Sequence, residues 1–406
     1  MADTARRRID VSEAAALIRD RLRGWGTVRV PIDAAQGEVL RQTITAERDQ
    51  PPFDRVTMDG IAIRHSALAD GAVSFRLAGT QGAGSAPVPL PDAASCVAIM
   101  TGAALPPGAD TVVPVERITR EGQTARVEAG YVPLPGQFVH RRGSDHAQGA
   151  TLLPPGILLG PTEMAVLTVG GSDSVEVARR PAITVISTGD ELVDVGALLG
   201  PTQIRSSNGW AIAAALASRG FLDCNRVHLP DDPVVLQGEL GQLLADQEVL
   251  ILTGGVSMGE FDYVPRVLQD LGMELVFHKV LQRPGMPLWF GISPEGKPVF
   301  ALPGNPVSSL VCLVRYVAPA LLAALGARAR PEPIVRLAQE VRFEPDLTCF
   351  LPVMLDYTPD GQCVAVPKPT NTSGDFVALS GTDGFVELPR GILEFPVGYS
   401  ARFFAW

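Results

Sequence analysis

The sequence predicts a multidomain protein in which a doubly wound α/β domain is combined with β-rich units, and three observations support this prediction. The chain has 406 residues, which is more than one hydrophobic core usually serves. Between about 181 and 328, short apolar strands alternate with helical segments. The stretches from about 51 to 146 and after 331 contain glycine, proline and short β-branched runs with little helical periodicity, as expected for two smaller β units.

The α/β region is predicted from strands of continuous apolar type. Such strands are buried on both faces, so they indicate a parallel sheet whose ligands lie outside the carboxyl ends of the strands. The expected strands are 183–187, 249–252 and 299–302, and the expected helices are 209–218, 232–245, 263–271 and 306–325. In the last helix Arg315 and Pro319 interrupt the apolar run, which predicts a core helix and not a membrane span.

Two helices are expected outside this region. Residues 10–23 place apolar side chains on one face, and Asp10 with Glu13 resembles an N-terminal capping box. Residues 161–169 read as a second helix that ends at Gly170-Gly171.

Composition excludes several classes of protein. A formal net charge of −10 argues against broad binding to nucleic acid or to an anionic membrane. The five cysteines are far apart, which argues against a disulfide framework or a structural zinc site, and the spacing of the five histidines does not suggest a zinc hydrolase. The N-terminus lacks the apolar stretch of a secretory signal, so a cytoplasmic protein is expected.

Three polar motifs directly follow predicted strands: STGDEL (187–192), TGGVSMG (253–259) and LPGNPVSS (302–309). Glycine permits positive φ and close approach of a ligand to backbone N–H groups. Asn305 suits an N-cap and Pro306 the first helical position, and a helix N-terminus binds phosphate. The motifs therefore predict a crevice for an anionic ligand, although strand-to-helix turns alone would also need such glycines.

Carboxylates cluster beside these motifs at Asp190, Glu191, Asp231, Asp232 and Asp262. Carboxylates at a phosphate site usually hold a divalent cation, most plausibly Mg²⁺. For Asp190 and Asp262, helix capping is the alternative interpretation.

Seven motifs in order resemble the molybdopterin molybdenumtransferases, the family of MoeA and of the gephyrin E domain. They are PPFDRVTMDGIAIR (51–64), MTGAALPPGADTVVPVE (100–116), RRGSDHAQG (141–149), ISTGDEL (186–192), TGGVSMGEFDYV (253–264), RPGMPLWFG (283–291) and LPGNPVSSL (302–310). The resemblance runs from Asp10 to the C-terminal strands.

The resemblance implies an elongated homodimer of four-domain subunits. The implied domains are a molybdopterin-binding α/β domain (1–25 and 178–328), a linking domain (26–48 and 148–177), a β-rich insertion domain (49–147) and a C-terminal β-barrel-like domain (329–406). The implied activity takes adenylylated molybdopterin and molybdate, inserts the metal at the dithiolene and releases AMP with the help of Mg²⁺. Implied partners are a second copy of the chain, other proteins of cofactor synthesis and the recipient apoenzymes.

The resemblance also assigns candidate site residues. Positions that match those used by family members for catalysis are Asp59, Thr101, Asp145, Glu191, Asp231 and Asp262, of which Glu191, Asp231 and Asp262 would hold the cation. The expected pterin-phosphate cradle comprises Thr253, Gly254, Gly255, Ser257, Gly304, Asn305, Pro306 and Ser308. Asp59 and Asp145 are expected to act across the dimer interface, with turn capping as the alternative.

The sequence departs from the family pattern where an oxyanion would bind. Arg283 replaces the first lysine of the common K-P-G-K-P motif, Met286 replaces the second, and Pro352 stands where an arginine is usual. The stretch RVTMDGIA also lacks the asparagine and tyrosine of the usual N-S-A-M-D-G-Y-A.

Three hypotheses follow from these matches and departures. The first is a metal-inserting transferase whose oxyanion contacts have shifted to Lys279, Arg283 and Ser373. The second is a carrier or regulator that keeps the pterin crevice without inserting metal. The third, an unrelated nucleotide-dependent α/β enzyme, is disfavoured because the chain lacks G-x-G-x-x-G and G-x-x-x-x-G-K-[ST] motifs.

Overall fold

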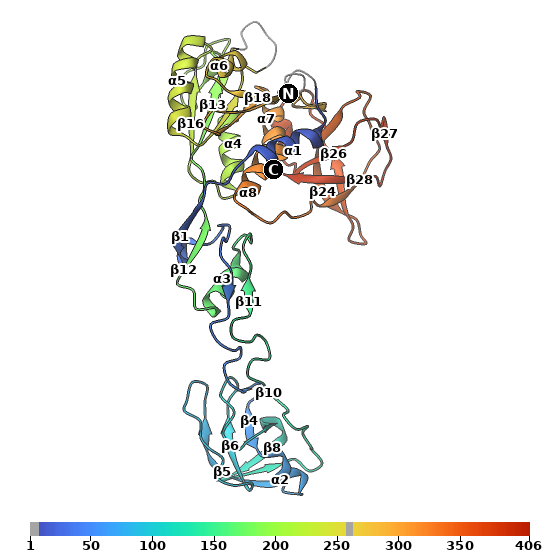
Figure 1. Ribbon diagram of the computed structural model, residues 1–406. Coiled ribbons are helices and arrows are strands. Elements are labelled where there is room, and N and C mark those ends of the chain that lie inside the picture. The colour runs from blue at the N-terminus through green and yellow to red at the C-terminus, as the bar shows by residue number, and fades with distance from the viewer. Residues whose placement is uncertain (1–7, 257–262) are drawn as a thin grey trace.

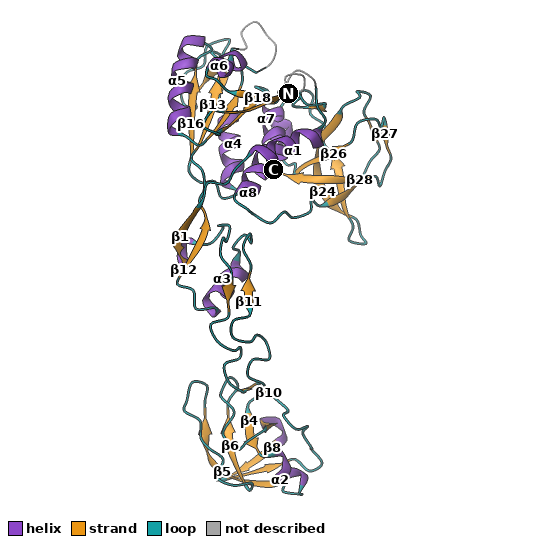
Figure 2. Cartoon of the chain, in the orientation of Figure 1, coloured by secondary structure: helices purple, strands orange, loops and turns teal. Residues whose placement is uncertain are grey.

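The computed structural model describes residues 8–256 and 263–406. Figure 1 shows an elongated molecule in which an α/β domain and a C-terminal β domain lie side by side at one end. A β-rich domain lies at the other end, and a slender linking region joins the two. Most helices are in the α/β domain (Figure 2), as the alternation of strands and helices predicts.

The α/β domain contains a six-stranded sheet in the order β16-β13-β17-β21-β20-β18. Its strands are β13 (Ile183–Thr188), β16 (Cys224–Leu229), β17 (Val249–Thr253), β18 (Glu274–His278), β20 (Trp289–Ile292) and β21 (Pro298–Leu302). Its helices are α4 (Asn208–Ala217), α5 (Pro233–Asp246), α6 (Val264–Asp270), α7 (Pro306–Cys312) and α8 (Ala318–Ala324). The predicted doubly wound α/β fold is confirmed, with β16, β13, β17 and β21 pairing in parallel.

The expectation of a wholly parallel sheet is wrong at one edge. There β20 pairs antiparallel with both β21 and β18. Only the turn 293–297 separates β20 from β21, and so short a connection allows a hairpin but not the crossover that parallel strands need.

The apolar segment after β21 is a core helix, as predicted. The helical run Pro306–Ala324 is long and apolar enough to cross a membrane, but 78% of its most apolar window is buried inside the protein. Its middle, Leu313–Val317, is a π-helical segment. This segment carries Arg315, whose Nε donates to Glu387 Oε2 at 2.7 Å within the C-terminal domain.

The C-terminal domain is a closed five-stranded barrel, which confirms the predicted barrel-like domain. Its strands are β22 (Ile334–Leu337), β24 (Thr348–Tyr357), β25 (Cys363–Pro367), β26 (Gly384–Leu388) and β28 (Ser400–Ala405). A short strand from the α/β domain, β19 (Gln282–Arg283), pairs with β24. Phe350, Phe385 and Phe404 join the same buried core as α7 and α8, so the barrel is packed firmly against the α/β domain.

The distal domain is built on a separate six-stranded sheet, in the order β7-β4-β6-β5-β9-β8. It comprises β4 (Gly60–Ile63), α2 (His65–Ala69), β5 (Ser74–Gln81), β6 (Ser95–Ile99), β7 (Thr111–Pro114), β8 (Ile118–Glu121) and β9 (Thr124–Val127), beside the pair β3 (Arg55–Val56) and β10 (Val139–His140). The linking region contains two antiparallel strand pairs and one helix. These are β1 (Thr27–Pro31) with β12 (Ser174–Ala178), β2 (Ile44–Thr45) with β11 (Thr151–Leu153), and α3 (Pro161–Val169).

The N-terminal helix α1 (Val11–Arg21) packs against α8. Asp10 occupies its N-cap position, but the side chain makes no cap hydrogen bond. The carboxylate instead accepts a hydrogen bond from Arg390 at 3.1 Å. The prediction that the Asp10 side chain caps α1 is therefore wrong, because this carboxylate bonds to Arg390 of the C-terminal domain instead.

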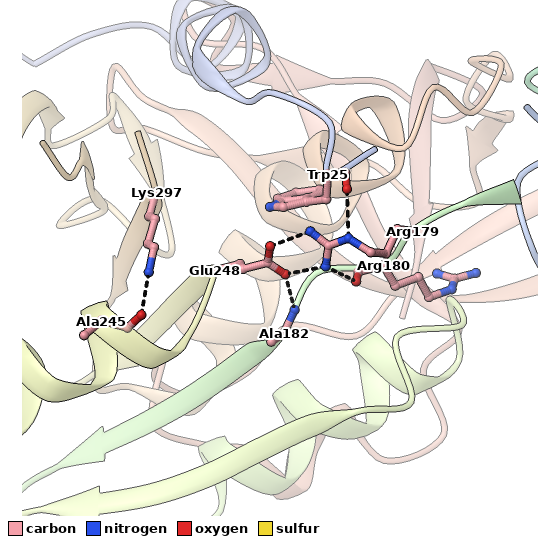
Figure 3. A network of polar contacts seen from close by, with 7 residues as sticks. All are labelled: Trp25, Arg179, Arg180, Ala182, Ala245, Glu248 and Lys297. Carbon is pink, nitrogen blue, oxygen red and sulfur yellow. Dashed lines mark hydrogen bonds and ion pairs between the residues drawn. The ribbon is translucent and has the colours of Figure 1, made fainter. Parts of the chain in front are cut away.

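A polar network holds the linking region to the sheet (Figure 3). Arg179 donates to both carboxylate oxygens of Glu248, at 2.9 and 2.6 Å, and to the carbonyl of Trp25 at 2.9 Å. Glu248 also accepts from the N–H of Ala182 at 3.0 Å, immediately before β13. The hydrogen bonds to Glu248, led by that from Arg179, lower the pKa of this carboxyl.

Candidate active site

A crevice of about 600 Å³ opens at the carboxyl ends of β13, β17 and β21, where the sequence predicts it. Its lining includes Thr188, Glu191, Arg205, Asn208, Asp231, Thr253, Gly254, Gly255, Pro303, Gly304, Asn305 and Pro306. Eight of the predicted site residues therefore come together in one chain. Ser257 and Asp262 lie outside the described residues.

The glycines of this crevice are required by geometry. Gly254 has φ +102°, and a Cβ on it would lie 2.5 Å from the carbonyl oxygen of Thr188. Gly255 has φ +62°, and a Cβ there would lie 2.8 Å from Val264. Positive φ and close approach both favour glycine, so the turn after β17 needs glycine at both positions to pack against Thr188 and Val264.

The crevice also contains polar atoms without partners. Asn208 Nδ2 donates to Thr253 Oγ1 at 2.8 Å and to the carbonyl of Gly304 at 2.7 Å, which joins the start of α4 to the other two loops. Asn208 Oδ1 and Thr188 Oγ1 are buried, and neither has a hydrogen-bond partner within the described part of the chain. Unpaired buried polar atoms are rare in native proteins, so these two indicate a ligand-binding surface.

The carboxylates divide into those that hydrogen-bond to nearby backbone N–H groups and those that line the crevice. Asp232 caps α5, because its Oδ1 accepts from Val234 N and Val235 N at 2.9 and 3.0 Å. Asp190 Oδ1 accepts from the N–H of Asp231 at 3.2 Å, outside the crevice lining. Glu191 and Asp231 line the crevice itself. Across residues 8–256 and 263–406, no three His, Cys, Asp or Glu side chains form a metal-binding group.

A second and larger cavity, of about 1,180 Å³, lies between the α/β domain and the barrel. It adjoins the crevice, because Pro287, Pro303 and Asn305 line both. Its wall includes Met286 and Pro352, at which the sequence departs from the family pattern. It also includes Arg283, Ser308 and Ser373, which are predicted site residues. Arg283 makes no ion pair within the described residues, and its side chain is exposed, so its guanidinium is available to an anion.

A buried amide positions the loop that carries Arg283 and Met286. Gln282 is fully buried, and its Nε2 donates to the carbonyls of Pro284 and Gly285 at 3.2 and 3.0 Å. The hydroxyl of Tyr316, on the π-helical segment, donates to Gln282 Oε1. The loop is therefore fixed to the core helix before any ligand binds.

Asn305 and Pro306 begin α7 as predicted, with Asn305 at the N-cap position and Pro306 at the first turn. The Asn305 side chain, however, makes no cap hydrogen bond and donates instead to Ser373 Oγ at 2.7 Å. Val307 N also donates to the carbonyl of Ser373 at 3.1 Å. Ser373 thus ties a barrel loop to the start of α7.

Lys279, a predicted oxyanion contact, lines neither cavity. Its backbone has φ +85° and its N–H donates to Leu288 O at 3.0 Å. A positive φ is uncommon for a lysine, so the sequence gives no sign that the backbone turns at Lys279.

Asp59 and Thr101 lie together in the distal domain, at the opposite end of the molecule from the crevice (Figure 1). Asp59 Oδ1 accepts from the Thr101 hydroxyl at 2.7 Å and from the Thr101 N–H at 2.6 Å, and these hydrogen bonds lower the pKa of Asp59. Asp145 accepts from His140 Nε2 at 2.9 Å. The structure therefore pairs Asp59 with Thr101 but does not bring either, or Asp145, to the crevice of the same chain.

The polar crevice residues that the sequence prediction did not assign include Thr188, Arg205 and Asn208. The serine-serine-asparagine run before the helix at 209–218 was the available signal for Asn208, since such residues favour helix starts. Arg205 is exposed and follows no predicted strand, so only the fold brings its positive charge to the crevice.

Family models match three parts of the chain. The MoeA N-terminal region (domain I and II) matches residues 9–171, the probable molybdopterin binding domain matches 184–323, and the MoeA C-terminal region (domain IV) matches 335–404.

Similar proteins cover nearly the whole chain. A molybdopterin molybdenumtransferase of Synechocystis is 39% identical over 400 residues, covering 98% of this chain and 100% of the relative. Another, from Synechococcus elongatus, is 35% identical over 376 residues, covering 89% and 90%. The crystal structure of a molybdopterin biosynthesis MoeA protein from Pyrococcus horikosii aligns with a TM-score of 0.79 and 30% identity, covering 98% of this chain and 99% of that one. With this identity over the full length, the chain belongs to the molybdopterin molybdenumtransferase family.

Proposed function

We propose that this protein takes adenylylated molybdopterin and molybdate, inserts the metal at the dithiolene and releases AMP with the help of Mg²⁺. The observation that supports this proposal is the pair of adjoining cavities. One is lined by glycines and by two unpaired polar atoms, and the other contains the exposed guanidinium of Arg283. A bipartite anionic substrate and a separate oxyanion need such adjoining sites.

The pterin phosphate would be held in the crevice. Gly254 and Gly255 line this crevice, and the unpaired Thr188 hydroxyl can donate to the phosphate. Asn208 Oδ1 only accepts, so it would pair with an N–H or O–H group of the ligand and not with the phosphate. Ser257, Gly304 and Pro306 complete the proposed cradle. A hydrogen bond that the ionised phosphate accepts is about twice as strong as one between two neutral groups.

Molybdate would bind in the second cavity beside Arg283, with Ser308 and Ser373 nearby. A charge-assisted hydrogen bond to a dianion contributes about 1.5–3 kcal/mol. Met286 offers no donor for this purpose. The proposal therefore predicts weaker molybdate capture here than in a relative with a second cation at that position.

The overall reaction is redox-neutral. The two dithiolene sulfurs displace one oxygen from molybdate, and that oxygen leaves as water with the two thiol protons. A second water adds across the phosphoanhydride, whose P–O bond breaks to give the pterin phosphate and AMP. Mg²⁺, when bound, would supply charge neutralisation at the phosphoanhydride. Glu191 and Asp231, which line the crevice, and Asp262 are the residues proposed to hold it.

The active unit is proposed to be a homodimer. Asp59 directly precedes β4, and Thr101 hydrogen-bonds to it, in the domain that lies at the other end of the molecule from the α/β domain. They would therefore act on the substrate bound in a second copy. Exposed apolar side chains beside them are Met58 and Met100, their neighbours in the chain, and Val115, whose N–H donates to the carbonyl of Asp59. These side chains are available to contact that copy.

The test is an AMP-release assay with purified protein, adenylylated molybdopterin, Mg²⁺ and molybdate. The proposal expects AMP release that depends on molybdate. Tight pterin binding without AMP release would instead favour a cofactor carrier or regulator of the same family, the alternative that Met286 and Pro352 support.

A further inference from the structure

The middle of the core helix bonds to two segments that form the walls of the larger cavity. Between α7 and α8 lies the π-helical segment Leu313–Val317, all of which is buried. Hydrogen bonds in a π-helical turn span five residues and not four, and such turns are rare and often mark functional sites. Two adjacent residues of this segment, Arg315 and Tyr316, carry polar groups into the core. They bond in different directions, one to the barrel and one to the loop of Arg283.

Arg315 fixes this segment to the barrel. Its Nε donates to Glu387 Oε2 at 2.7 Å, and Arg402 donates to the other carboxylate oxygen. Glu387 lies on β26 opposite Phe350 of β24, and Phe350 and Pro352 line the cavity. A buried ion pair adds little stability compared with an apolar pair of the same size. Its main effect here is therefore to fix where the core helix lies against that wall of the cavity.

Tyr316 fixes the side chain of Gln282. Tyr316 is 2% exposed, and Gln282 is fully buried. Burial raises the pKa of the Tyr316 hydroxyl well above its ordinary value, so the hydroxyl stays protonated and donates to Gln282 Oε1. That bond turns the amide nitrogen towards the carbonyls of Pro284 and Gly285. Loss of the hydroxyl would take this donor from a buried acceptor, which costs free energy.

The loop has little room to move between these groups. Gly285 has φ +91°, and a Cβ on it would lie 2.7 Å from both Cys312 Sγ and Gln282 Nε2. The Cys312 thiol also donates to the carbonyl of Gly285 at 3.6 Å. Gln282 and Arg283 form β19, which pairs with β24 of the barrel. Arg283 therefore extends from a backbone that the core helix holds on one side and the barrel on the other.

We infer that Tyr316 is a positioning residue for the oxyanion site, because through Gln282 it fixes the backbone from which Arg283 reaches the cavity. Arg315 anchors the same helical turn to the barrel. This inference rests on the proposed function, because molybdate is the proposed ligand of Arg283. A cation held in place loses less conformational entropy on binding than a mobile one. Tyr316 itself lines neither cavity, so its effect on molybdate must pass through the residues that it holds.

The test is Tyr316→Phe, which removes the hydroxyl and keeps the ring in the core. Two measurements use the full-length protein: a molybdate titration of AMP release from adenylylated molybdopterin with Mg²⁺, and amide hydrogen exchange of residues 282–288. We expect the molybdate concentration for half-maximal release to rise about threefold to tenfold, as for the loss of one hydrogen bond. The rate at saturating molybdate should stay unchanged. Exchange should become faster at 282–288 but not in β26.

Tyr399→Phe is the matched control, since Tyr399 packs on Phe395 in the barrel, with ring centres 5.0 Å apart, and lines neither cavity. Its molybdate dependence should equal that of the wild type. Gln282→Leu should raise the half-saturating molybdate concentration at least as much as Tyr316→Phe, and combining the two should add nothing. In an Arg283→Ala background, Tyr316→Phe should have no further effect, because the cation that it positions is gone.

Two results would overturn the inference. One is a wild-type protein that responds to molybdate and whose molybdate dependence is unchanged by both Tyr316→Phe and Gln282→Leu. The other is an equal shift from Tyr316→Phe with and without Arg283, which would mean a general effect on the fold. A wild-type protein without molybdate-dependent AMP release would contradict the proposed function, and hydrogen exchange would then decide the inference. Faster exchange at 282–288 in Tyr316→Phe would uphold Tyr316 as the residue that positions the loop, and unchanged exchange would reject it.

Discussion

Arg283 and Met286 share one wall of the interdomain cavity, yet only the arginine can contact an oxyanion through a charged donor. Their loop is fixed by Gln282 and Tyr316, so a longer cationic side chain at 286 would project from a preformed backbone. We predict that Met286→Lys lowers the molybdate concentration for half-maximal metal insertion by about tenfold, the equivalent of roughly 1.4 kcal/mol.

The measurement is a molybdate titration of AMP release, with pterin affinity followed separately by calorimetry. Met354→Lys is the matched control, because Met354 is exposed (43%) on the barrel and does not line the cavity. An identical molybdate dependence in the wild type and Met286→Lys would show that position 286 does not contact the oxyanion. A similar gain in Met354→Lys would point to net charge and not to the site.

Residue patterns predict the local backbone geometry of this protein well, but they do not predict the hydrogen bonds between residues that are far apart in the sequence. The glycines after β17 and the Asn305-Pro306 helix start lie where the sequence places them. The hydrogen bond from Asn305 to Ser373 joins residues 68 positions apart, and no local rule indicates it. Asn208 was missed for the same reason, since its partners come from two other loops.

At the scale of elements, the sheet of the α/β domain is joined to the linking region through Glu248. Its carboxylate accepts from Arg179 and from the N–H that precedes β13. The pKa of Glu248 is lowered in the folded protein, chiefly by the hydrogen bond from Arg179. The resulting stability is therefore present above the ordinary glutamate pKa of about 4.3 and is lost as pH falls below it towards the folded pKa.

We predict that Glu248→Gln lowers the melting temperature near pH 7, and that its difference from the wild type narrows as pH falls from about 5 to 3. The check is thermal unfolding of both proteins across that range. Glu239→Gln, at an exposed position on α5, should match the wild type throughout. A constant gap between Glu248→Gln and the wild type at every pH would mean that the ionisation of Glu248 is not what stabilises this junction.

At this scale the main error of the sequence prediction was the direction of the strands at one edge of the α/β sheet. Helix 161–169 coincides with α3 because proline and glycine mark its ends in the sequence. The antiparallel strand β20 is as apolar and as fully buried as its neighbour β21, and only the short connection between them indicates that they run antiparallel. Periodicity cannot report strand direction.

At the scale of the whole molecule, the distance between the two ends is the feature with the largest functional consequence. The Asp59–Thr101 pair and the crevice that contains Asp231 lie at opposite ends of one chain (Figure 1). In the proposed homodimer, each distal domain would complete the crevice of the partner. A C₂ arrangement makes the two composite sites equivalent.

This arrangement predicts a specific rescue. Asp59→Ala and Asp231→Ala should each be inactive alone. After the two are mixed and their subunits exchanged, each heterodimer would contain one site with both substitutions and one with neither. Random exchange makes half of the dimers heterodimers, so activity should return to about a quarter of the wild-type value. The matched control mixes Asp59→Ala with Thr101→Ala. Both substitutions lie in the distal domain, so each site of that heterodimer keeps one defect and no activity should return. Recovery in both mixtures, or in neither despite demonstrated exchange, would show that Asp59 does not act in the crevice of the partner.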